Sequence, residues 1–241
     1  TQEAKDIGLV DSTFANSTGL DDPNHKMSAR DVATVSLHLL RTYPEYYGFF
    51  SEKEFKYRKH RFFNRNPLLS EKLGVDGLKT GHTKLSGYGL AASALQDGRR
   101  LIAVVMGLPT SLKRKTSARR LIQWGYTALT DAVLFEPADI VGYARVWGGE
   151  DFYVPLQAQS AVTLPVMRTI SNPIFSASIV YDGPLKPPVR RGDKVADLEI
   201  SGPLGSQHKV ALYAAEDVAR GTMVRQGLDS LAIMLGRYIG L

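Results

Sequence analysis

Residues 76–83 read Asp-Gly-Leu-Lys-Thr-Gly-His-Thr and decide the fold of the first half of the chain. An apolar run from Leu73 to Leu78 leads into this stretch, and an alternating segment from Tyr88 to Leu95 follows it. That pattern predicts a strand in an antiparallel sheet. A lysine, a hydroxyl and two glycines at the end of such a run favour a chemical role over a packing role.

The strand geometry assigns each residue of the motif a place. Neighbouring residues on a strand point to opposite faces, so Lys79 and Gly81 share one face and Thr80 faces the other unless the strand twists or bulges. Gly81 leaves room for a ligand to lie along this edge as an added strand. The backbone N–H of His82 is a candidate donor to a developing oxyanion, with the charge of Lys79 beside it. No acid–base role is assigned to the His82 imidazole.

The same stretch, followed by Ser86-Gly87-Tyr88, resembles the third motif of the low-molecular-mass penicillin-binding proteins, the serine D-alanyl-D-alanine carboxypeptidases. Other segments are similar to the family in the same chain order, closely up to about residue 128 and more loosely beyond. These are Gly19-Leu20-Asp21, Ser28-Ala29-Arg30-Asp31, Phe63-Asn64-Arg65-Asn66, Val105-Met106-Gly107 and Trp124-Gly125.

The family pattern also includes a Ser-x-x-Lys and a Ser-x-Asn in front of the Lys-Thr-Gly. The sequence has no Ser-x-Asn, and its single Ser-x-x-Lys, Ser206 to Lys209, follows Lys79 in a Gly- and Pro-rich turn. We interpret it as a coincidence. An acyl-enzyme needs a serine activated by an adjacent base, so this chain alone is expected to be inactive. Because it starts at Thr1 rather than Met, we expect it to be a piece of something longer.

Two arginines are candidate ligands of a substrate carboxylate. Arg65 lies in an Asn-Arg-Asn turn, and Arg114 is expected in a loop after the strand that contains Met106. The resemblance implies that both lie near the terminal carboxylate of the substrate, which a guanidinium can bind through two parallel hydrogen bonds. The alternative is that each is a surface arginine paired with a nearby acid.

Further elements of the first half follow from capping and turn signals. Ser28 predicts the start of a helix through Arg41, with His38 as a packing residue. Residues 55–63 predict an exposed strand or hairpin arm, and Asp97-Gly98 predicts a tight hairpin. An amphipathic helix is predicted over residues 116–129, with Trp124 in the core.

From Val133 the chain reads as short strands broken by Gly and Pro, which is typical of a small β-sandwich. The last segment, residues 222–241, predicts an amphipathic helix with one apolar stripe, formed by Val224, Leu228, Leu231, Leu235 and Tyr238. Charged residues interrupt it, so it is expected to lie in the plane of a membrane surface rather than to span it. The alternative is a terminal helix docked on the β-rich domain.

Composition narrows the function classes. An apolar content of 44% with 22% charged residues is that of a globular protein. A net charge of +6 is spread along the chain without interleaved aromatics, so no nucleic-acid partner is predicted. There is no cysteine, which leaves no disulfide and no thiolate metal site. No metal or organic cofactor is expected.

The predicted fold class is α+β. Residues 1–132 are expected to form part of a β-lactamase/transpeptidase-like domain, residues 133–221 a β-sandwich, and residues 222–241 the amphipathic membrane-anchor helix.

The resemblance implies a peptidase that removes the terminal D-alanine of peptidoglycan stem peptides and is acylated by β-lactams. It would be periplasmic, on the outer face of the inner membrane. The resemblance assigns four roles: Lys79 supplies positive charge, Thr80 supplies a hydroxyl, Gly81 leaves space for the ligand, and the backbone N–H of His82 donates to the oxyanion. The alternatives are a β-lactamase or esterase of the same architecture and a non-catalytic scaffold of the cell envelope.

Overall fold

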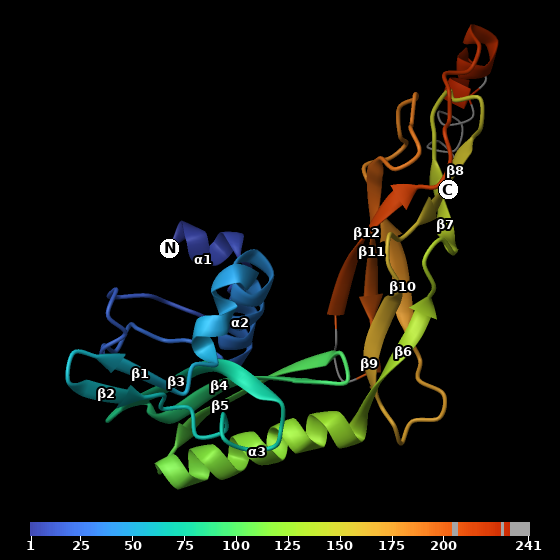
Figure 1. Ribbon diagram of the computed structural model, residues 1–241. Coiled ribbons are helices and arrows are strands. Elements are labelled where there is room, and N and C mark those ends of the chain that lie inside the picture. Colours follow the sequence, from blue (N-terminus) through green and yellow to red (C-terminus); the bar gives the residue numbers. More distant parts are fainter. Residues whose placement is uncertain (204–206, 228, 232–241) are drawn as a thin grey trace. The chain divides into compact units, whose positions relative to one another are not determined.

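The computed structural model describes residues 1–203, 207–227 and 229–231, and the chain divides into two compact units. The first unit contains residues 1–127 and the second begins at Ala128 (Figure 1). Each unit has its own hydrophobic core. The domain boundary expected after residue 132 falls inside strand β6 (Leu129–Phe135), and the structural division lies in front of that strand.

The first unit is built around a three-stranded antiparallel sheet. Its strands are β3 (Val75–Thr83), β4 (Gly87–Gln96) and β5 (Arg99–Leu108), in that order across the sheet. The turn between β4 and β5 has positive φ at Asp97 (48°) and Gly98 (76°), as the predicted two-residue hairpin requires. The predicted antiparallel sheet is therefore confirmed.

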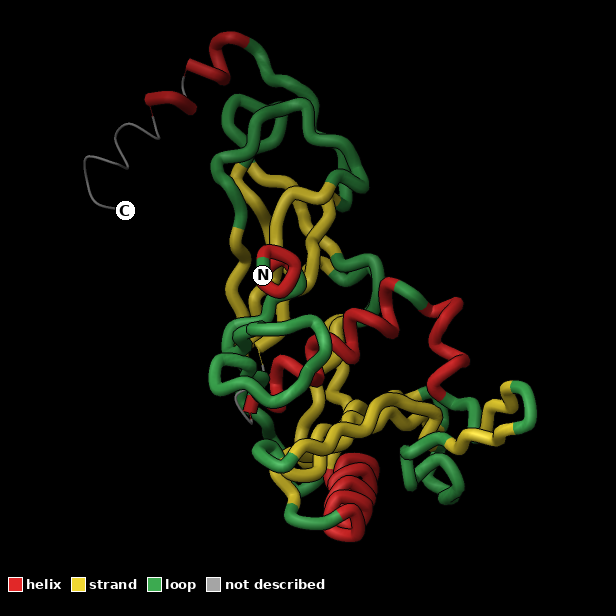
Figure 2. The backbone as a smooth tube through the Cα atoms, turned by 90° about the vertical axis from the view of Figure 1, so that its left-hand side faces the viewer, coloured by secondary structure: helices red, strands yellow, loops and turns green. Residues whose placement is uncertain are grey.

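Helices cover both faces of this sheet. Helices α1 (Gln2–Asp6) and α2 (Ala29–Thr42) and the 3-10 helix η1 (Pro44–Phe50) precede it, and α3 (Ser111–Ala128) follows it. The sheet lies between α2 and α3 in both views (Figures 1 and 2). The Ser28 hydroxyl caps α2 by accepting a hydrogen bond from the Asp31 backbone N–H at 3.1 Å, as predicted.

Helix α3 begins earlier than predicted, and it ends at Ala128, one residue before the predicted end. It begins at Ser111 rather than at residue 116, which places Arg114 inside the helix and not in a loop. Its buried side is formed by Arg114, Ala118, Ile122 and Gly125. The expected core position of Trp124 is wrong, because this side chain is 45% exposed.

Two short strands, β1 (Glu54–Tyr57) and β2 (His60–Phe63), form a separate antiparallel hairpin between η1 and β3. All eight of their residues are exposed, which confirms the expected exposed arm. The turn between the strands consists of Arg58, with a φ of 54°, and Lys59.

The second unit has two antiparallel sheets around one core. Strands β7 (Ile140–Arg145), β8 (Tyr153–Gln157), β10 (Ser176–Val180), β11 (Lys194–Ser201) and β12 (Gln207–Ala214) form a sheet in the order β10-β11-β12-β8-β7. Strand β6 pairs with β9 (Val162–Met167). Leu164 of β9 is buried in the same cluster as Leu156 and Leu212 of the larger sheet. The α+β class with a β-rich second part is confirmed.

Residues 223–227 and 229–231 are helical, and their polar side faces the β-rich unit. The buried Asp229 carboxylate pairs with Arg145 and accepts a hydrogen bond from the Gly148 N–H at 2.7 Å. Val224 and Leu231 are exposed. The rest of the predicted stripe, Leu228, Leu235 and Tyr238, lies outside the described residues, as does Ser206. Within the described ranges, no helix has the length and apolar character needed to cross a bilayer.

Candidate active site

The Lys-Thr-Gly stretch lies on β3, at one edge of the three-stranded sheet. Strand β3 pairs with β4 on one side and has no partner strand on the other within the described part of the chain. Thr80 is buried, whereas Lys79 and Gly81 are exposed, in the alternation expected for a strand. A Cβ atom on Gly81 would meet no heavy atom within 4 Å. The edge therefore has room for an extended ligand beside Gly81.

Lys79 is part of a cleft. Residues 79–82 line a cavity of ≈ 760 Å³ together with Arg65, Leu85, Ser86 and parts of residues 18–27. The Lys79 ammonium donates a hydrogen bond to the Thr80 carbonyl oxygen at 2.6 Å. This contact holds the charge of Lys79 along the edge of β3, next to Gly81.

Both candidate arginines reach the same part of the strand. Arg65, Thr80, Gly81, His82, Tyr88 and Arg114 line a second hollow of ≈ 410 Å³. Arg65 is exposed, and Arg114 is buried, with 7% of its surface accessible. Across the described residues, neither guanidinium forms an ion pair with a carboxylate. The hollow thus combines two cations that lack an anionic partner within the described chain.

Arg114 is held by one aromatic ring and one hydroxyl rather than by an acid. Its guanidinium carbon lies 5.6 Å from the centroid of the Tyr88 ring, and its Nη2 is 3.4 Å from the Ser111 hydroxyl. Its Nε is buried and has no hydrogen-bond partner within the described chain. Because an unsatisfied buried donor is costly, Arg114 is well suited to bind an anion that enters the hollow.

Tyr88 links this arginine to the motif strand. It lies opposite His82 in the pairing of β3 with β4, and the two rings are 3.9 Å apart between centroids. The Tyr88 ring therefore contacts both the His82 ring of the motif strand and the Arg114 guanidinium. Tyr88 was not predicted as a site residue, although the register of a hairpin between residues 83 and 87 would have paired it with His82.

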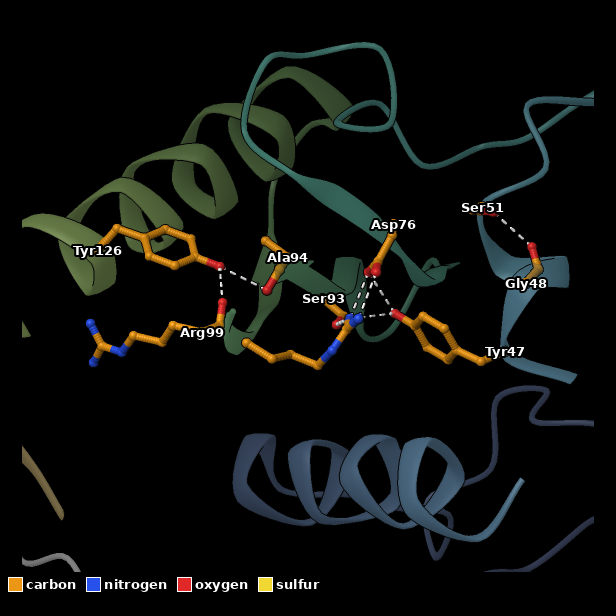
Figure 3. Close-up of polar contacts among 9 residues, drawn as sticks. Tyr47, Gly48, Ser51, Asp76, Ser93, Ala94, Arg99 and Tyr126 are labelled. Atoms are coloured by element: carbon orange, nitrogen blue, oxygen red, sulfur yellow. Dashed lines mark hydrogen bonds and ion pairs between the residues drawn. The ribbon is translucent and has the colours of Figure 1, made fainter. Parts of the chain in front are cut away.

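A polar network fixes the start of β3 (Figure 3). The Asp76 carboxylate accepts hydrogen bonds from the Tyr47 hydroxyl at 2.7 Å and from Arg100 at 2.8 Å. Arg100 also donates to the Ser93 hydroxyl at 2.6 Å. These four side chains come from η1, β3, β4 and β5. Burial, with the adjacent Asp76 carboxylate, raises the pKa of Tyr47 to about 12.

This network was not predicted either. The signal for it was a polar Ser93 in the middle of the apolar segment from Leu90 to Leu95, since a fully buried hydroxyl needs a hydrogen-bond partner.

The Asn-Arg-Asn turn is tied to the same strand. The buried Asn66 side chain donates a hydrogen bond to the Gly77 carbonyl oxygen at 2.9 Å, and its backbone N–H donates to the Asn64 side chain at 2.9 Å. Asn64 in turn donates to the Phe50 and Glu52 carbonyl oxygens. Arg65 is thus anchored on both sides, which explains why an exposed arginine is held next to Lys79 and Thr80.

No group of three or more His, Cys, Asp or Glu side chains with the geometry to hold a metal ion occurs within residues 1–203, 207–227 and 229–231. Around Gly81 the site offers the cations Lys79, Arg65 and Arg114, the Thr80 hydroxyl and backbone groups, while Asp21 and Asp22 line another part of the larger cavity. Such a set can bind and polarise an anionic peptide end through hydrogen bonds and charge.

Two family models match the chain. The model of the D-alanyl-D-alanine carboxypeptidases matches residues 1–110, and that of the C-terminal domain of penicillin-binding protein 5 matches residues 131–220. The fold and the Lys-Thr-Gly edge define a member of the penicillin-binding proteins. The chain belongs to the D-alanyl-D-alanine carboxypeptidase family.

Curated relatives agree with this assignment. The chain is 36% identical to the D-alanyl-D-alanine carboxypeptidase DacA of Haemophilus influenzae over 191 residues. This alignment covers 78% of this chain and 49% of the relative. It is 32% identical to DacC of Escherichia coli, over 98% of this chain and 60% of the relative. The chain therefore spans only about half to three-fifths of the length of these relatives.

Solved structures show the same fold. Penicillin-binding protein 5 of Haemophilus influenzae superposes with a TM-score of 0.70 and 33% identity, over 91% of this chain and 64% of that one. Penicillin-binding protein 6B of Escherichia coli superposes with a TM-score of 0.57 and 30% identity, over 87% of this chain and 57% of that one.

Proposed function

We propose that this chain is the substrate-binding part of a serine-type D-Ala-D-Ala carboxypeptidase that removes the terminal D-alanine of peptidoglycan stem peptides. The observation that carries the proposal is the free edge of β3. There, Lys79 and the space at Gly81 adjoin a hollow lined by Arg65 and Arg114, which have no anionic partner within the described chain.

In this proposal the peptide end lies along β3 as an added strand. The space at Gly81 admits its backbone. Arg114, with Arg65 and the Thr80 hydroxyl, binds the terminal carboxylate, because a guanidinium fork meets two carboxylate oxygens at once. The His82 backbone N–H donates to the oxygen of the scissile carbonyl as it gains negative charge, and Lys79 contributes positive charge beside it.

The attacking serine and its base belong to the Ser-x-x-Lys and Ser-x-Asn motifs, which precede the Lys-Thr-Gly in the family and do not occur in residues 1–78. We therefore propose that this chain alone binds the peptide and does not cleave it. The same serine would be acylated by β-lactams, which we propose to bind at the same edge.

We also propose a periplasmic location, with residues 222–241 lying on the outer face of the inner membrane. Support comes from the exposed side chains of Val224 and Leu231, while Asp229 is turned toward the β-rich unit. An apolar face left in solvent suits an in-plane helix on a bilayer surface.

A non-catalytic scaffold of the cell envelope is the second candidate, and residues 1–241 carry no Ser-x-x-Lys before Lys79. The two functions differ in their response to a fluorescent penicillin. A form of the protein that carries a Ser-x-x-Lys segment is expected to be labelled, and Lys79→Ala in that form should keep the fold and lose the label. A labelled Lys79→Ala variant would contradict the proposed role of Lys79, and no labelling of the unchanged form would favour the scaffold.

A further inference from the structure

The hairpin β1–β2 presents one face made only of rings. Phe55 lies opposite Phe62, and Tyr57 lies opposite His60. Residues directly opposite each other, and residues two apart on one strand, share a face of the ribbon. Phe55, Tyr57, His60 and Phe62 therefore form one face, which we call the ring face. The other face carries Glu54, Lys56, Arg61 and Phe63.

The ring face is open to solvent. Phe55, Tyr57 and Phe62 are 64%, 54% and 55% exposed, and His60 is exposed as well. The Phe55 and Tyr57 rings are nearly parallel, with an interplanar angle of 11° and centroids 6.5 Å apart. No residue of the hairpin belongs to either hydrophobic core. Adjacent exposed aromatics of this kind mark an interaction surface.

Positive charge is concentrated on the same arm, so the expectation that basic residues are spread along the chain without interleaved aromatics is wrong for residues 53–65. Residues 53–65 contain six Lys or Arg and one Glu, which gives a net charge of 6 − 1 = +5, against +6 for the whole chain. Arg58 and Lys59 form the turn at the tip, and the Arg58 guanidinium lies 5.3 Å from the centroid of the Tyr57 ring. The arm therefore suits an anionic partner that also offers flat apolar surfaces.

The arm is continuous with the candidate active site. The Asn64 N–H donates to the Lys53 carbonyl oxygen at 2.9 Å and closes the base of the hairpin, and the next residue is Arg65. A hollow of ≈ 380 Å³ next to this base is lined by residues of η1, by Asn64 and Arg65, and by Leu78, Lys79 and Thr80 of β3. A polymer that places a peptide end at β3 can thus reach the hairpin with a neighbouring segment.

We propose that the ring face binds the sugar chain of the peptidoglycan whose stem peptide occupies β3. This rests on the proposed function. The faces of sugar rings that carry C–H groups pack on aromatic rings, and the free carboxylates of the stem peptides match the positive arm. Each four-residue strand is roughly 13 Å long at about 3.3 Å per residue, so the ring face can contact more than one sugar.

A membrane surface fits the hairpin less well. Segments that enter a bilayer surface place aromatic and apolar side chains in the apolar layer and keep Lys and Arg at the headgroups. Here the tip is Arg58 and Lys59, and the rings lie along one side of the ribbon. That arrangement favours a polymer lying across the ribbon over insertion of its tip.

The test compares binding of the 241-residue chain to three probes: glycan chains stripped of their peptides, a soluble peptide ending in D-Ala-D-Ala, and vesicles containing phosphatidylglycerol. The variant combines Phe55→Ala, Tyr57→Ala and Phe62→Ala. Phe63→Ala is the matched control, because this ring is 68% exposed on the opposite face of the same hairpin. Both variants lie outside the cores, so the midpoint of thermal unfolding should not change.

The triple variant should bind peptide-free glycan roughly tenfold or more weakly, while Phe63→Ala changes this affinity less than about twofold. Binding of the soluble peptide should be the same in both variants. If the peptide does not bind but the glycan result holds, the proposed function fails and the ring-face site stands. The ring-face proposal is overturned if the unchanged chain does not bind peptide-free glycan, if Phe63→Ala weakens glycan binding equally, or if the triple variant loses only vesicle binding.

Discussion

Asp76 and Arg100 form a two-pronged ion pair across the sheet, with both Nη1–Oδ1 and Nη2–Oδ2 at 2.8 Å. Asp76 is on β3 and Arg100 on β5, so the pair reaches past the intervening strand β4. The Ser93 hydroxyl on β4 accepts from the same guanidinium. This relationship sets the position of β3 in the sheet three residues before Lys79.

The stability of the first unit should depend on this pair. Asp76→Asn leaves Arg100 without its charged partner and should lower the free energy of unfolding by about 1–3 kcal/mol. Urea unfolding of the two proteins measures the difference. The control is Glu54→Gln, which removes the exposed ion pair with Arg61 and should change stability by less than about 0.5 kcal/mol. Equal effects of the two substitutions would show that the Asp76 network does not hold β3.

Tyr47 should make the fold sensitive to high pH. Its pKa is about 12 in the folded chain against an ordinary value of 10.0, because burial and the Asp76 carboxylate disfavour the phenolate. A raised pKa stabilises the fold fully below pH 10, and this contribution is lost as the pH rises through about 12. Absorbance titration should show a late phenolate near pH 12 that Tyr47→Phe removes. A Tyr47→Phe titration identical to that of the unchanged chain would refute this environment.

Glu71 should make the stability of the fold depend on pH in the acidic range. Its carboxylate accepts a hydrogen bond from Arg119 Nε at 2.7 Å and pairs with Lys115 at 2.9 Å, and the hydrogen bond from Arg119 is the main cause of its lowered pKa. A lowered pKa stabilises the fold above the unfolded value of 4.5, and that contribution disappears as the pH falls through the folded pKa. Glu71→Gln should therefore flatten the loss of thermal stability below pH 4.5. If the thermal stability of Glu71→Gln falls with pH as steeply as that of the unchanged chain, the interaction of Glu71 with Arg119 and Lys115 does not stabilise the fold.

A side chain at position 81 should leave the fold intact but block binding of the peptide. A Cβ at this position has open space around it, so Gly81→Val should leave the midpoint of thermal unfolding nearly unchanged. The added branched side chain would stand where the peptide backbone is proposed to lie, and affinity for a D-Ala-D-Ala peptide should fall roughly tenfold or more. Gly125→Val is the contrasting variant, since a Cβ there would come within 2.7 Å of Leu101 and should destabilise the fold. Full peptide affinity in Gly81→Val would place the ligand elsewhere.

Local signals in the sequence were sufficient for much of the fold. Asp97-Gly98 adopts positive φ at both turn positions, and Ser28 caps α2, because these are interactions between near neighbours. The motif strand and its alternation of Lys79 and Thr80 follow from the same local pattern.

The start of α3 and the buried state of Arg114 were not predictable in this way. Residues 111–115 carry three basic side chains and one exposed leucine, so no apolar stripe marks a helix there. The fold buries Arg114 and brings Tyr88, which is distant in the sequence, against its guanidinium. The ring face was missed for a related reason. Continuous alternation through residues 55–63 separates Phe55 from Phe62, whereas the two-residue turn at Arg58 and Lys59 returns them to one face.

Affinity for a peptide with a free C-terminus tests the central claim most directly. The 241-residue chain is titrated with a stem peptide ending in D-Ala-D-Ala and with the same peptide carrying a C-terminal amide. If Arg114 and Arg65 bind the carboxylate, the free acid should bind at least about tenfold more tightly, and Arg114→Gln should abolish this preference. Equal affinity for the acid and the amide, or a preference that survives Arg114→Gln, would contradict the account.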